Sequence, residues 1–289
     1  MWALVVNPTS GQGSGRRVGA QVAQFLSNRS VPFKIIETNS AKLTSASLRS
    51  FLGSNPNSEG VIAVGGDGLV HLVIQIVAQT KVPVAFIPAG TGNDFVRALG
   101  WPLNDINEQM RSMFSTPPHY IDLGKSGSDW FAAILSTGFD SLVNERANGM
   151  KWPRGRMKYN VAMARELPFF SPREYSLVLD RKQIKTAAML IAVGNSRSYG
   201  GGMNVCPDAQ LDDGLLDVMI LAPVSIPEFL KVFPKVYKGT HIYHPAVSIH
   251  RAKEVRIDAD AIAYADGERM GPLPIIANSV PQALLTWRR

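Results

Sequence analysis

A buried strand that runs directly into a glycine-rich turn is the feature that most constrains the fold of this chain. Val61-Ile62-Ala63-Val64 is a short, mostly β-branched apolar run, and Gly65-Gly66-Asp67-Gly68 follows it at once. Leu69–Gln79 then has the apolar content of a helix. This order places the turn at a helix N-terminus, where backbone N–H groups and the helix dipole favour an anion. On its own, the turn is equally typical of a plain strand-to-helix connection.

The first half of the chain repeats this alternation. Further apolar runs predict strands, and the segments between them predict helices. The expected strands are Ala3–Val6, Phe33–Glu37, Val61–Val64 and Val84–Ile87, and the expected helices are Arg17–Asn28 and Leu69–Gln79. Such alternation predicts an α/β domain of the Rossmann-like type, with a parallel sheet and crossover helices. Ligands of these domains bind beyond the carboxyl ends of the strands.

Two more glycine-rich loops follow strands of this predicted sheet. Asn7–Arg17 contains three glycines, three hydroxyls and two arginines, which suits a phosphate cradle, although it matches neither a Walker A motif nor a dinucleotide fingerprint. Gly90-Thr91-Gly92-Asn93-Asp94 follows Val84–Ile87 and offers a hydroxyl and two residues that can cap the next helix. Each loop alone fits an ordinary turn, but three of them at three strand ends indicate a nucleotide site.

The order and spacing of these loops resemble the diacylglycerol kinase catalytic family, which includes bacterial soluble lipid kinases and sphingosine kinases. The resemblance rests on Asn7-Pro8-Thr9-Ser10-Gly11, Gly65-Gly66-Asp67-Gly68 and Gly90-Thr91-Gly92-Asn93-Asp94. The second of these is shared with NAD kinases and phosphofructokinases, whereas the third is more specific to lipid kinases. The resemblance covers almost the whole chain. It implies that the γ-phosphate of ATP is transferred, with Mg²⁺, to a hydroxyl of a diacylglycerol-like or related lipid.

The second half changes character near Ile121-Asp122-Leu123-Gly124, after which strands dominate. The expected strands are Trp130–Leu135, Tyr175–Leu179, Ala187–Val193, Leu216–Leu221, Val255–Ile257, Ala263–Ala265 and Leu284–Trp287. Asp180-Arg181-Lys182 predicts a hairpin turn, and Lys158–Glu166 and Ile226–Lys238 predict helices. The resemblance implies a nucleotide-binding domain over residues 1–122, a mostly antiparallel β-sandwich domain for the lipid substrate over 123–289, and an active cleft between them.

The resemblance also implies roles for individual residues. Glu268, in Asp266-Gly267-Glu268, would be the general base that accepts the proton of the attacking hydroxyl. Asp67 would organise a catalytic Mg²⁺ and the phosphates. The residues implied to contact the nucleotide are Asn7, Ser10, Gly11, Gly13, Thr38, Gly65, Gly66, Asp67, Gly68, Thr91 and Asn93.

Asp212-Asp213-Gly214 fits either a hairpin turn or a site for a hard cation, because Mg²⁺ prefers oxygen ligands. By resemblance, the Asp213 carboxylate and the main-chain carbonyls of Gln210 and Leu215 would hold a structural Mg²⁺. Asp212 would not be a ligand.

The chain departs from the family pattern directly after Gly68. The threonine and the Asn-Glu pair expected there are replaced by Leu69, His71 and Leu72. This departure motivates one alternative, a nucleotide- or lipid-binding protein with weak or no turnover. Phosphorylation of a soluble nucleotide, as in NAD kinases, is the other alternative.

Composition and charge set the remaining expectations. The 289 residues are 45% hydrophobic, and their apolar runs are well short of the roughly 20 residues of a spanning helix. The single Cys206 excludes an intrachain disulfide, and no signal peptide is recognisable, so we expect a cytoplasmic protein. The net charge of +7 suggests an anionic partner. Lys151–Tyr159 interleaves four cations with two aromatics, which suits a membrane surface or a nucleic acid, and Lys151–Lys158 is the expected contact segment. For a lipid kinase we expect peripheral membrane contact and no nucleic acid.

Overall fold

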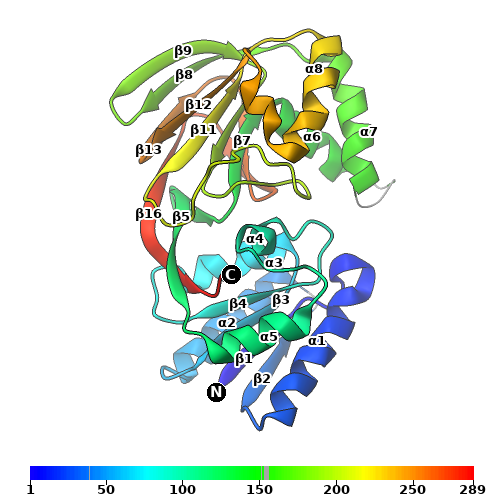
Figure 1. Cartoon of the computed structure of the whole chain (residues 1–289), viewed down its shortest axis with the longest axis vertical. Coiled ribbons are helices and arrows are strands. Elements are labelled where there is room, and N and C mark those ends of the chain that lie inside the picture. Colours follow the sequence, from blue (N-terminus) through cyan, green and yellow to red (C-terminus); the bar gives the residue numbers. More distant parts are fainter. Residues whose placement is uncertain (39, 151, 153–155) are drawn as a thin grey trace. The chain divides into compact units, whose positions relative to one another are not determined.

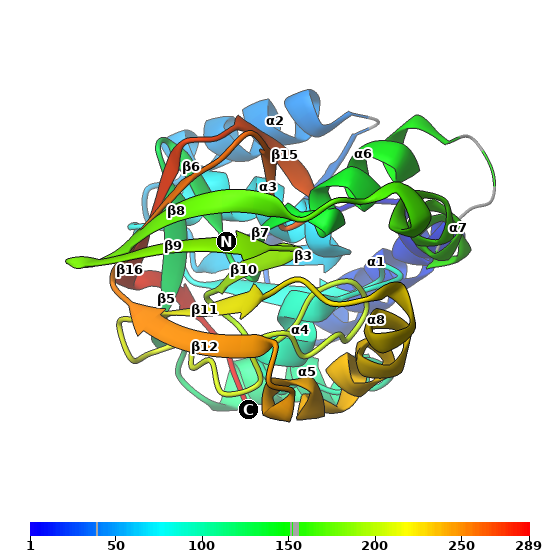
Figure 2. The ribbon, with the colours of Figure 1, turned by 90° about the horizontal axis from the view of Figure 1, so that it is seen from above.

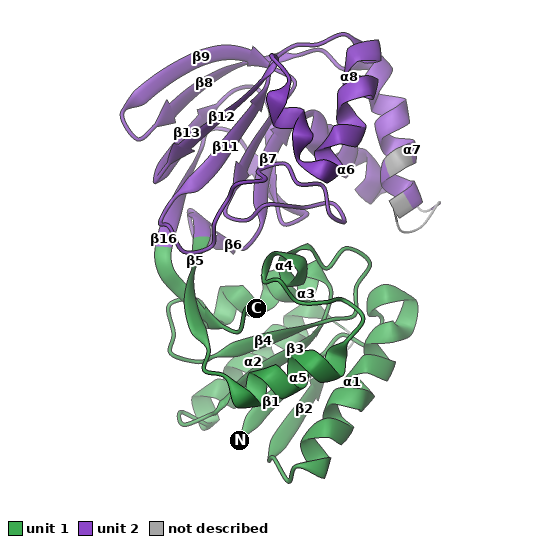
Figure 3. Ribbon diagram, viewed as in Figure 1, with its two compact units in different colours: residues 1–123, 281–289 green, residues 124–280 purple. Residues whose placement is uncertain are grey.

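The computed structural model describes residues 1–38, 40–150, 152 and 156–289. They form two compact units: unit 1 is Met1–Leu123 with Pro281–Arg289, and unit 2 is Gly124–Val280 (Figure 3). The division expected from the sequence instead places the C-terminal residues in the second domain. They belong with unit 1 because Thr286 pairs with Val84, and the Trp101 indole donates a 2.9 Å hydrogen bond to the Trp287 carbonyl.

Unit 1 is built on a parallel sheet, as the sequence predicts, and its strand order is β2-β1-β3-β4. The strands are β1 (Trp2–Val6), β2 (Phe33–Glu37), β3 (Gly60–Gly65) and β4 (Val84–Pro88), and the helices are α1 (Ser10–Asn28), α2 (Ala41–Ser54), α3 (Asp67–Val77), α4 (Asp94–Ala98) and α5 (Ile106–Ser115). Helices α1 and α5 cover one face of the sheet, and α2 and α3 cover the other (Figure 1). With both faces covered, every residue of β1, β3 and β4 is buried, which explains their unbroken apolar runs.

Unit 2 is a β-sandwich. One sheet has the order β16-β13-β8-β9, with β5 paired to β16 and β6 paired to β5, and the other has the order β12-β11-β10-β7-β14-β15. The strands are β5 (His119–Ser126), β6 (Asp129–Phe131), β7 (Ile134–Gly138), β8 (Arg173–Leu179), β9 (Lys182–Ala188), β10 (Leu190–Gly194), β11 (Leu216–Leu221), β12 (Val247–Ala252), β13 (Glu254–Asp258), β14 (Ile262–Ala265), β15 (Glu268–Pro272) and β16 (Ile275–Thr286). The pairings within the second sheet are antiparallel, which confirms the predicted class.

Helices cover the outer face of the second sheet of unit 2. They are α6 (Phe139–Gly149), α7 (Arg156–Glu166) and α8 (Ile226–Val232), with short 3-10 turns at Leu167–Phe169, Phe233–Lys238 and Thr240–Tyr243. The three helices group beside the sheets in Figures 1 and 2. Alternate residues of β11 therefore face different cores: Val218 packs between the sheets, and Met219 packs under Phe139 and Phe229.

Three predicted elements of unit 2 are each divided in two. Trp130–Leu135 is not one strand, because the Ala132 and Ala133 amides donate to the Asp266 carboxylate instead of to a neighbouring strand. Ala187–Val193 is broken at Met189, where the chain passes from the first sheet to the second. Ile226–Lys238 changes from an α-helix to a 3-10 turn around Pro234, which lacks the N–H that would continue the helix. The predicted hairpin at Asp180–Lys182 is confirmed.

Candidate active site

The predicted nucleotide-binding residues of unit 1 gather at one edge of its sheet. Asn7 follows β1, Thr38 follows β2, Gly66 follows β3, and Gly90 lies two residues beyond the end of β4. Because the four strands are parallel, their carboxyl ends share one edge. Loops that lie far apart in the sequence are therefore neighbours in space.

The three glycine loops pack backbone against backbone. A Cβ on Gly90 would lie 2.5 Å from the Gly66 Cα, and a Cβ on Gly11 would lie 2.3 Å from the Ala89 carbonyl oxygen. Real side chains do not tolerate such distances, so the close approach requires glycine at both places. The Ser14 hydroxyl strengthens the packing by donating a 2.9 Å hydrogen bond to the same Ala89 carbonyl.

The loop after β1 is irregular although it lies within the bounds of α1. Gly11, Gln12 and Gly13 have φ of 55°, 59° and 97°, all in the left-handed region. Successive residues of this kind are found where backbone N–H groups form an anion-binding concavity. Asn7 shapes the preceding turn, since its Oδ1 accepts hydrogen bonds from the Thr9 amide at 3.2 Å and hydroxyl at 3.0 Å. The regular helix therefore begins beyond the glycines.

Asn93 holds the third loop closed. Its Oδ1 accepts from the Gly90 amide at 2.8 Å and its Nδ2 donates to the Gly90 carbonyl at 2.9 Å, while the side chain is buried. Asn93 also occupies the N-cap position of α4, at φ 53°, but without a capping hydrogen bond from its side chain. Asp67 links this loop to the start of α3, because its Oδ1 accepts from the Phe95 amide at 3.3 Å. The Thr91 side chain is exposed to solvent.

The remaining predicted residues of unit 1 have local partners. The Thr38 hydroxyl donates a 2.9 Å hydrogen bond to the Ser40 carbonyl at the N-cap of α2. Leu69, where the family pattern has threonine, is buried, and a Cβ on Gly65 would lie 2.7 Å from its Cδ2. This departure therefore places an apolar side chain in the core under the loop. His71 lies one turn before Gln75 on α3, and their side-chain nitrogens are 3.4 Å apart.

Glu268 lies in unit 2, at the first position of β15. Asp266 and Gly267 form the two-residue turn that joins β14 to β15, with φ of 52° and 86°. The Asp266 carboxylate accepts hydrogen bonds from the Ala132 amide at 2.7 Å and the Ala133 amide at 2.8 Å. The Glu268 side chain is exposed to solvent. The Asp266 carboxylate thus anchors the turn, and Glu268, the predicted base, follows the turn directly with its side chain in solvent.

A second contact holds the same hairpin. The Glu145 carboxylate of α6 accepts from the Tyr264 hydroxyl at 2.6 Å and from Arg269 Nε at 2.8 Å. These donors lower the pKa of Glu145, with the tyrosine bond first. Burial and the same hydrogen bond raise the pKa of Tyr264 to about 12. Glu145 therefore stays ionised and ties β14 and β15 to α6 on both sides of Glu268.

Unit 2 also contains a partly buried carboxylate, Asp140, that sequence reasoning missed. It accepts hydrogen bonds from the Ser136 hydroxyl at 2.5 Å and from the Asn144 amide at 3.2 Å. Burial raises the pKa of Asp140 despite these donors. The pKa of Tyr159 is raised by burial and by the charges of Asp140 and Glu268. The available signal was an aspartate that directly follows Gly138-Phe139 after an apolar strand.

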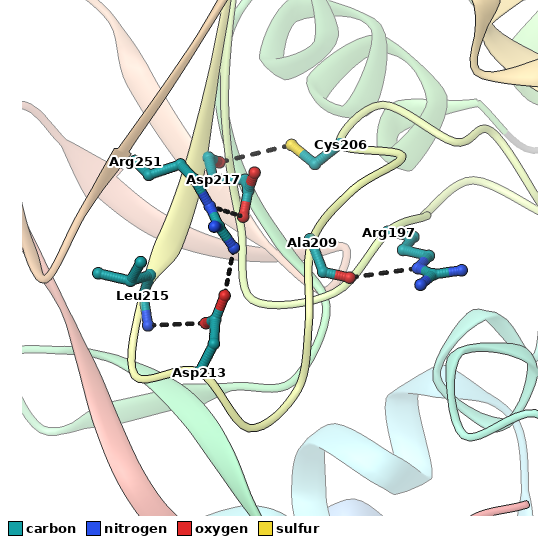
Figure 4. A network of polar contacts seen from close by, with 7 residues as sticks. All are labelled: Arg197, Cys206, Ala209, Asp213, Leu215, Asp217 and Arg251. Carbon is teal, nitrogen blue, oxygen red and sulfur yellow. Dashed lines mark hydrogen bonds and ion pairs between the residues drawn. The ribbon is translucent and has the colours of Figure 1, made fainter.

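The predicted structural metal site lies before β11. Asp213 Oδ1 accepts a 3.0 Å hydrogen bond from the Leu215 amide, and its Oδ2 pairs with the Arg251 guanidinium. Arg251 Nε also lies 3.4 Å from Asp217 Oδ2, so Figure 4 shows one guanidinium joined to two carboxylates. A guanidinium at Asp213 does not fit a second cation on the same oxygen. Of the expected Mg²⁺ ligands Gln210, Asp213 and Leu215, Asp213 is therefore already paired with a cation of the chain itself.

Two other expectations concern metals and membranes. In the described part of the chain, no group of three or more His, Cys, Asp or Glu side chains could hold a metal ion. No described helix has both the length and the apolar character needed to cross a bilayer. Of the segment Lys151–Lys158, expected to contact membranes, residues 151 and 153–155 lie outside the described residues.

Comparison with known proteins gives the family. Residues 1–126 match the diacylglycerol kinase catalytic domain, and residues 133–287 match the YegS C-terminal NAD kinase beta sandwich-like domain. The chain is 38% identical to a diacylglycerol kinase of Mycobacterium tuberculosis, covering 98% of this chain and 94% of that protein. It is 29% identical to one of Bacillus subtilis, with 94% and 90% covered. A crystal structure of a diacylglycerol kinase from Bacillus anthracis shares the fold, with a TM-score of 0.76 at 20% identity over 100% of this chain and 96% of that one.

The fold and these matches define a kinase with an alcohol group as acceptor, built from an α/β domain and a β-sandwich. The chain belongs to the diacylglycerol kinase family.

Proposed function

We propose that this chain is an ATP-dependent lipid kinase that transfers the γ-phosphate to a hydroxyl of a diacylglycerol-like lipid. The observation that carries the proposal is the packing of three glycine loops at one sheet edge, around Gly11, Gly66 and Gly90. Loops of this kind present backbone N–H groups to an anion with no side chain in between. Family membership supports the lipid as acceptor.

In the proposed reaction, the loops bind and orient the triphosphate. Glu268 accepts the proton of the lipid hydroxyl while the new O–P bond forms and the bond between the γ-phosphorus and the bridging oxygen breaks, leaving ADP. Mg²⁺ bound with ATP would supply charge neutralisation at the phosphates. Asp67 suits the task of holding that ion, because it lies in the first turn of α3 beside the loops.

Exchange of Glu268 for glutamine tests its role. We expect Glu268→Gln to lower phosphoryl transfer by about 10²–10⁴-fold, the usual contribution of a general base, and to leave ATP binding unchanged. Glu254→Gln, another exposed glutamate at the start of a strand of unit 2, is the control and should transfer normally. Undiminished transfer by Glu268→Gln would rule out its role as the base.

The departure at Leu69, His71 and Leu72 supports a second candidate, a family member that binds nucleotide without turnover. Burial of Leu69 against Gly65 weakens this candidate, because the loop keeps its close packing with the apolar residue in place. A protein that binds ATP in equilibrium dialysis but transfers no phosphate to lipid or to NAD would establish it.

Peripheral membrane contact follows from the proposed substrate, which resides in a bilayer. Trp152 and Phe169 support it, being 79% and 87% exposed, since aromatic side chains insert at membrane interfaces. Trp152→Ala/Phe169→Ala should sediment less with anionic vesicles than the parent chain, and equal sedimentation would contradict this contact.

A further inference from the structure

The loop before β11 concentrates acidic side chains. Asp208, Asp212, Asp213 and Asp217 lie within ten residues of one another. Asp217 is almost fully buried, with its side chain 2% exposed, and the Asp213 side chain is 20% exposed. Carboxylates this close repel one another, and a buried carboxylate requires a partner of opposite charge.

Arg251 meets this requirement by its position in the sheet. It lies on β12 directly opposite Asp217 on β11, so the antiparallel register brings the two side chains together. From there its planar guanidinium reaches Asp217 through Nε and Asp213 through Nη2 (Figure 4). A fork of five N–H donors can satisfy two carboxylates at once, which a single ammonium does less well.

The loop itself is further tied to the chain by other hydrogen bonds. Asp213 Oδ1 accepts from the Leu215 amide, which fixes the turn leading into β11. Arg197 Nε donates to the Ala209 carbonyl at 3.2 Å, and the Cys206 thiol donates to the Asp217 carbonyl at 3.4 Å. These bonds set the backbone path, and the guanidinium of Arg251 pairs with two of the carboxylates along it, Asp213 and Asp217.

We propose that Arg251 takes the place of a divalent cation at this loop, so that residues 207–217 reach their folded geometry without Mg²⁺. The guanidinium already pairs with Asp213 Oδ2, and its repulsion of a dication on the same carboxylate disfavours joint occupancy. The proposal concerns this structural position alone. It is independent of the Mg²⁺ that would accompany ATP and of whether the chain transfers phosphate.

Amide hydrogen exchange over residues 210–216 tests the proposal in the full chain, with EDTA or with millimolar Mg²⁺. In the parent chain, exchange should be the same in both buffers. In Arg251→Gln, exchange in EDTA should be faster by about tenfold, which corresponds to losing a charged hydrogen bond at the low end of its usual contribution because the pair is partly exposed. Mg²⁺ should restore protection in this variant. Arg256→Gln, an exposed arginine of β13 on the same unit, is the control and should match the parent chain.

Three results would overturn the proposal. One is Mg²⁺-dependent protection of the parent loop; another is full protection of Arg251→Gln in EDTA. The third is failure of Mg²⁺ to restore the Arg251→Gln loop, which would show that the position does not accept a dication. If Arg251→Gln does not fold, Asp213→Asn gives the same information from the other partner. The loop of Asp213→Asn should lose protection equally in both buffers. Recovery of its protection with Mg²⁺ would refute the role given to Asp213 and Arg251.

Discussion

Asp266 should be the residue whose loss most disturbs the placement of Glu268. Its carboxylate accepts two main-chain hydrogen bonds, from Ala132 and Ala133. A hydrogen bond to a charged group contributes about 1.5–3 kcal/mol, and because Asp266 is only partly buried we take the low end, about 3 kcal/mol for the pair. Asp266→Ala also puts an alanine at φ 52°, which costs about 1 kcal/mol more.

These figures, about 4 kcal/mol together, predict a lowering of the melting temperature of unit 2 by about 8–16 °C for Asp266→Ala, measured by calorimetry. Asp266→Gly, which removes the carboxylate without strain at this φ, should be slightly less affected than Asp266→Ala. Faster exchange of the Ala132 and Ala133 amides should accompany the loss. Transfer should fall by up to about 10²-fold, because Glu268 is displaced, while ATP binding is unchanged.

Asp258→Asn is the matched control, since this exposed aspartate lies at the end of a strand of the same unit. It should melt and react as the parent chain does. The reasoning fails if Asp266→Ala leaves the exchange of both alanine amides and the melting temperature unchanged.

Two further predictions concern other parts of the molecule. Gly90→Ala should destabilise unit 1 by about 1–3 kcal/mol in denaturant titrations, because its Cβ would overlap the Gly66 Cα, whereas Gly68→Ala has open space and should fold normally. If the loops hold phosphates, Gly68→Ala should nonetheless weaken ATP binding, and unchanged binding would argue against close contact there. Glu145→Gln should have a lower free energy of unfolding than the parent chain at pH 7, by about 1 kcal/mol once solvent screening is taken into account. Since the folded pKa of Glu145 is depressed, this difference is complete above about pH 4.3 and disappears as the pH falls through the folded value; a difference that persists there would contradict it.

The sequence predicts the strands of unit 1 well because burial on both faces leaves unbroken apolar runs such as Val61–Val64. It fails where tertiary contacts decide local structure. Ala132 and Ala133 continue an apolar pattern, yet a carboxylate more than 130 residues away takes their amides. Helix α2 was missed because its buried face is small, consisting of Thr44, Leu48 and Phe51.

The candidate site likewise has parts that the sequence predicts and parts that it does not. Glycine loops can be located from sequence because the requirement for glycine is local. The partners of a charged side chain cannot, since Arg251 meets Asp217 only through the register of β11 and β12. Glu145 likewise reaches Tyr264 and Arg269 only after α6 has packed beside the β14–β15 hairpin.

The most direct test of the proposed activity is to follow the γ-phosphate itself. The purified chain is incubated with γ-labelled ATP and Mg²⁺, with diacylglycerol and other lipid alcohols in mixed micelles and with NAD as the competing acceptor. The account predicts label in a lipid, and loss of that label with Glu268→Gln. Label in NADP, or no transfer despite measurable ATP binding, would contradict it.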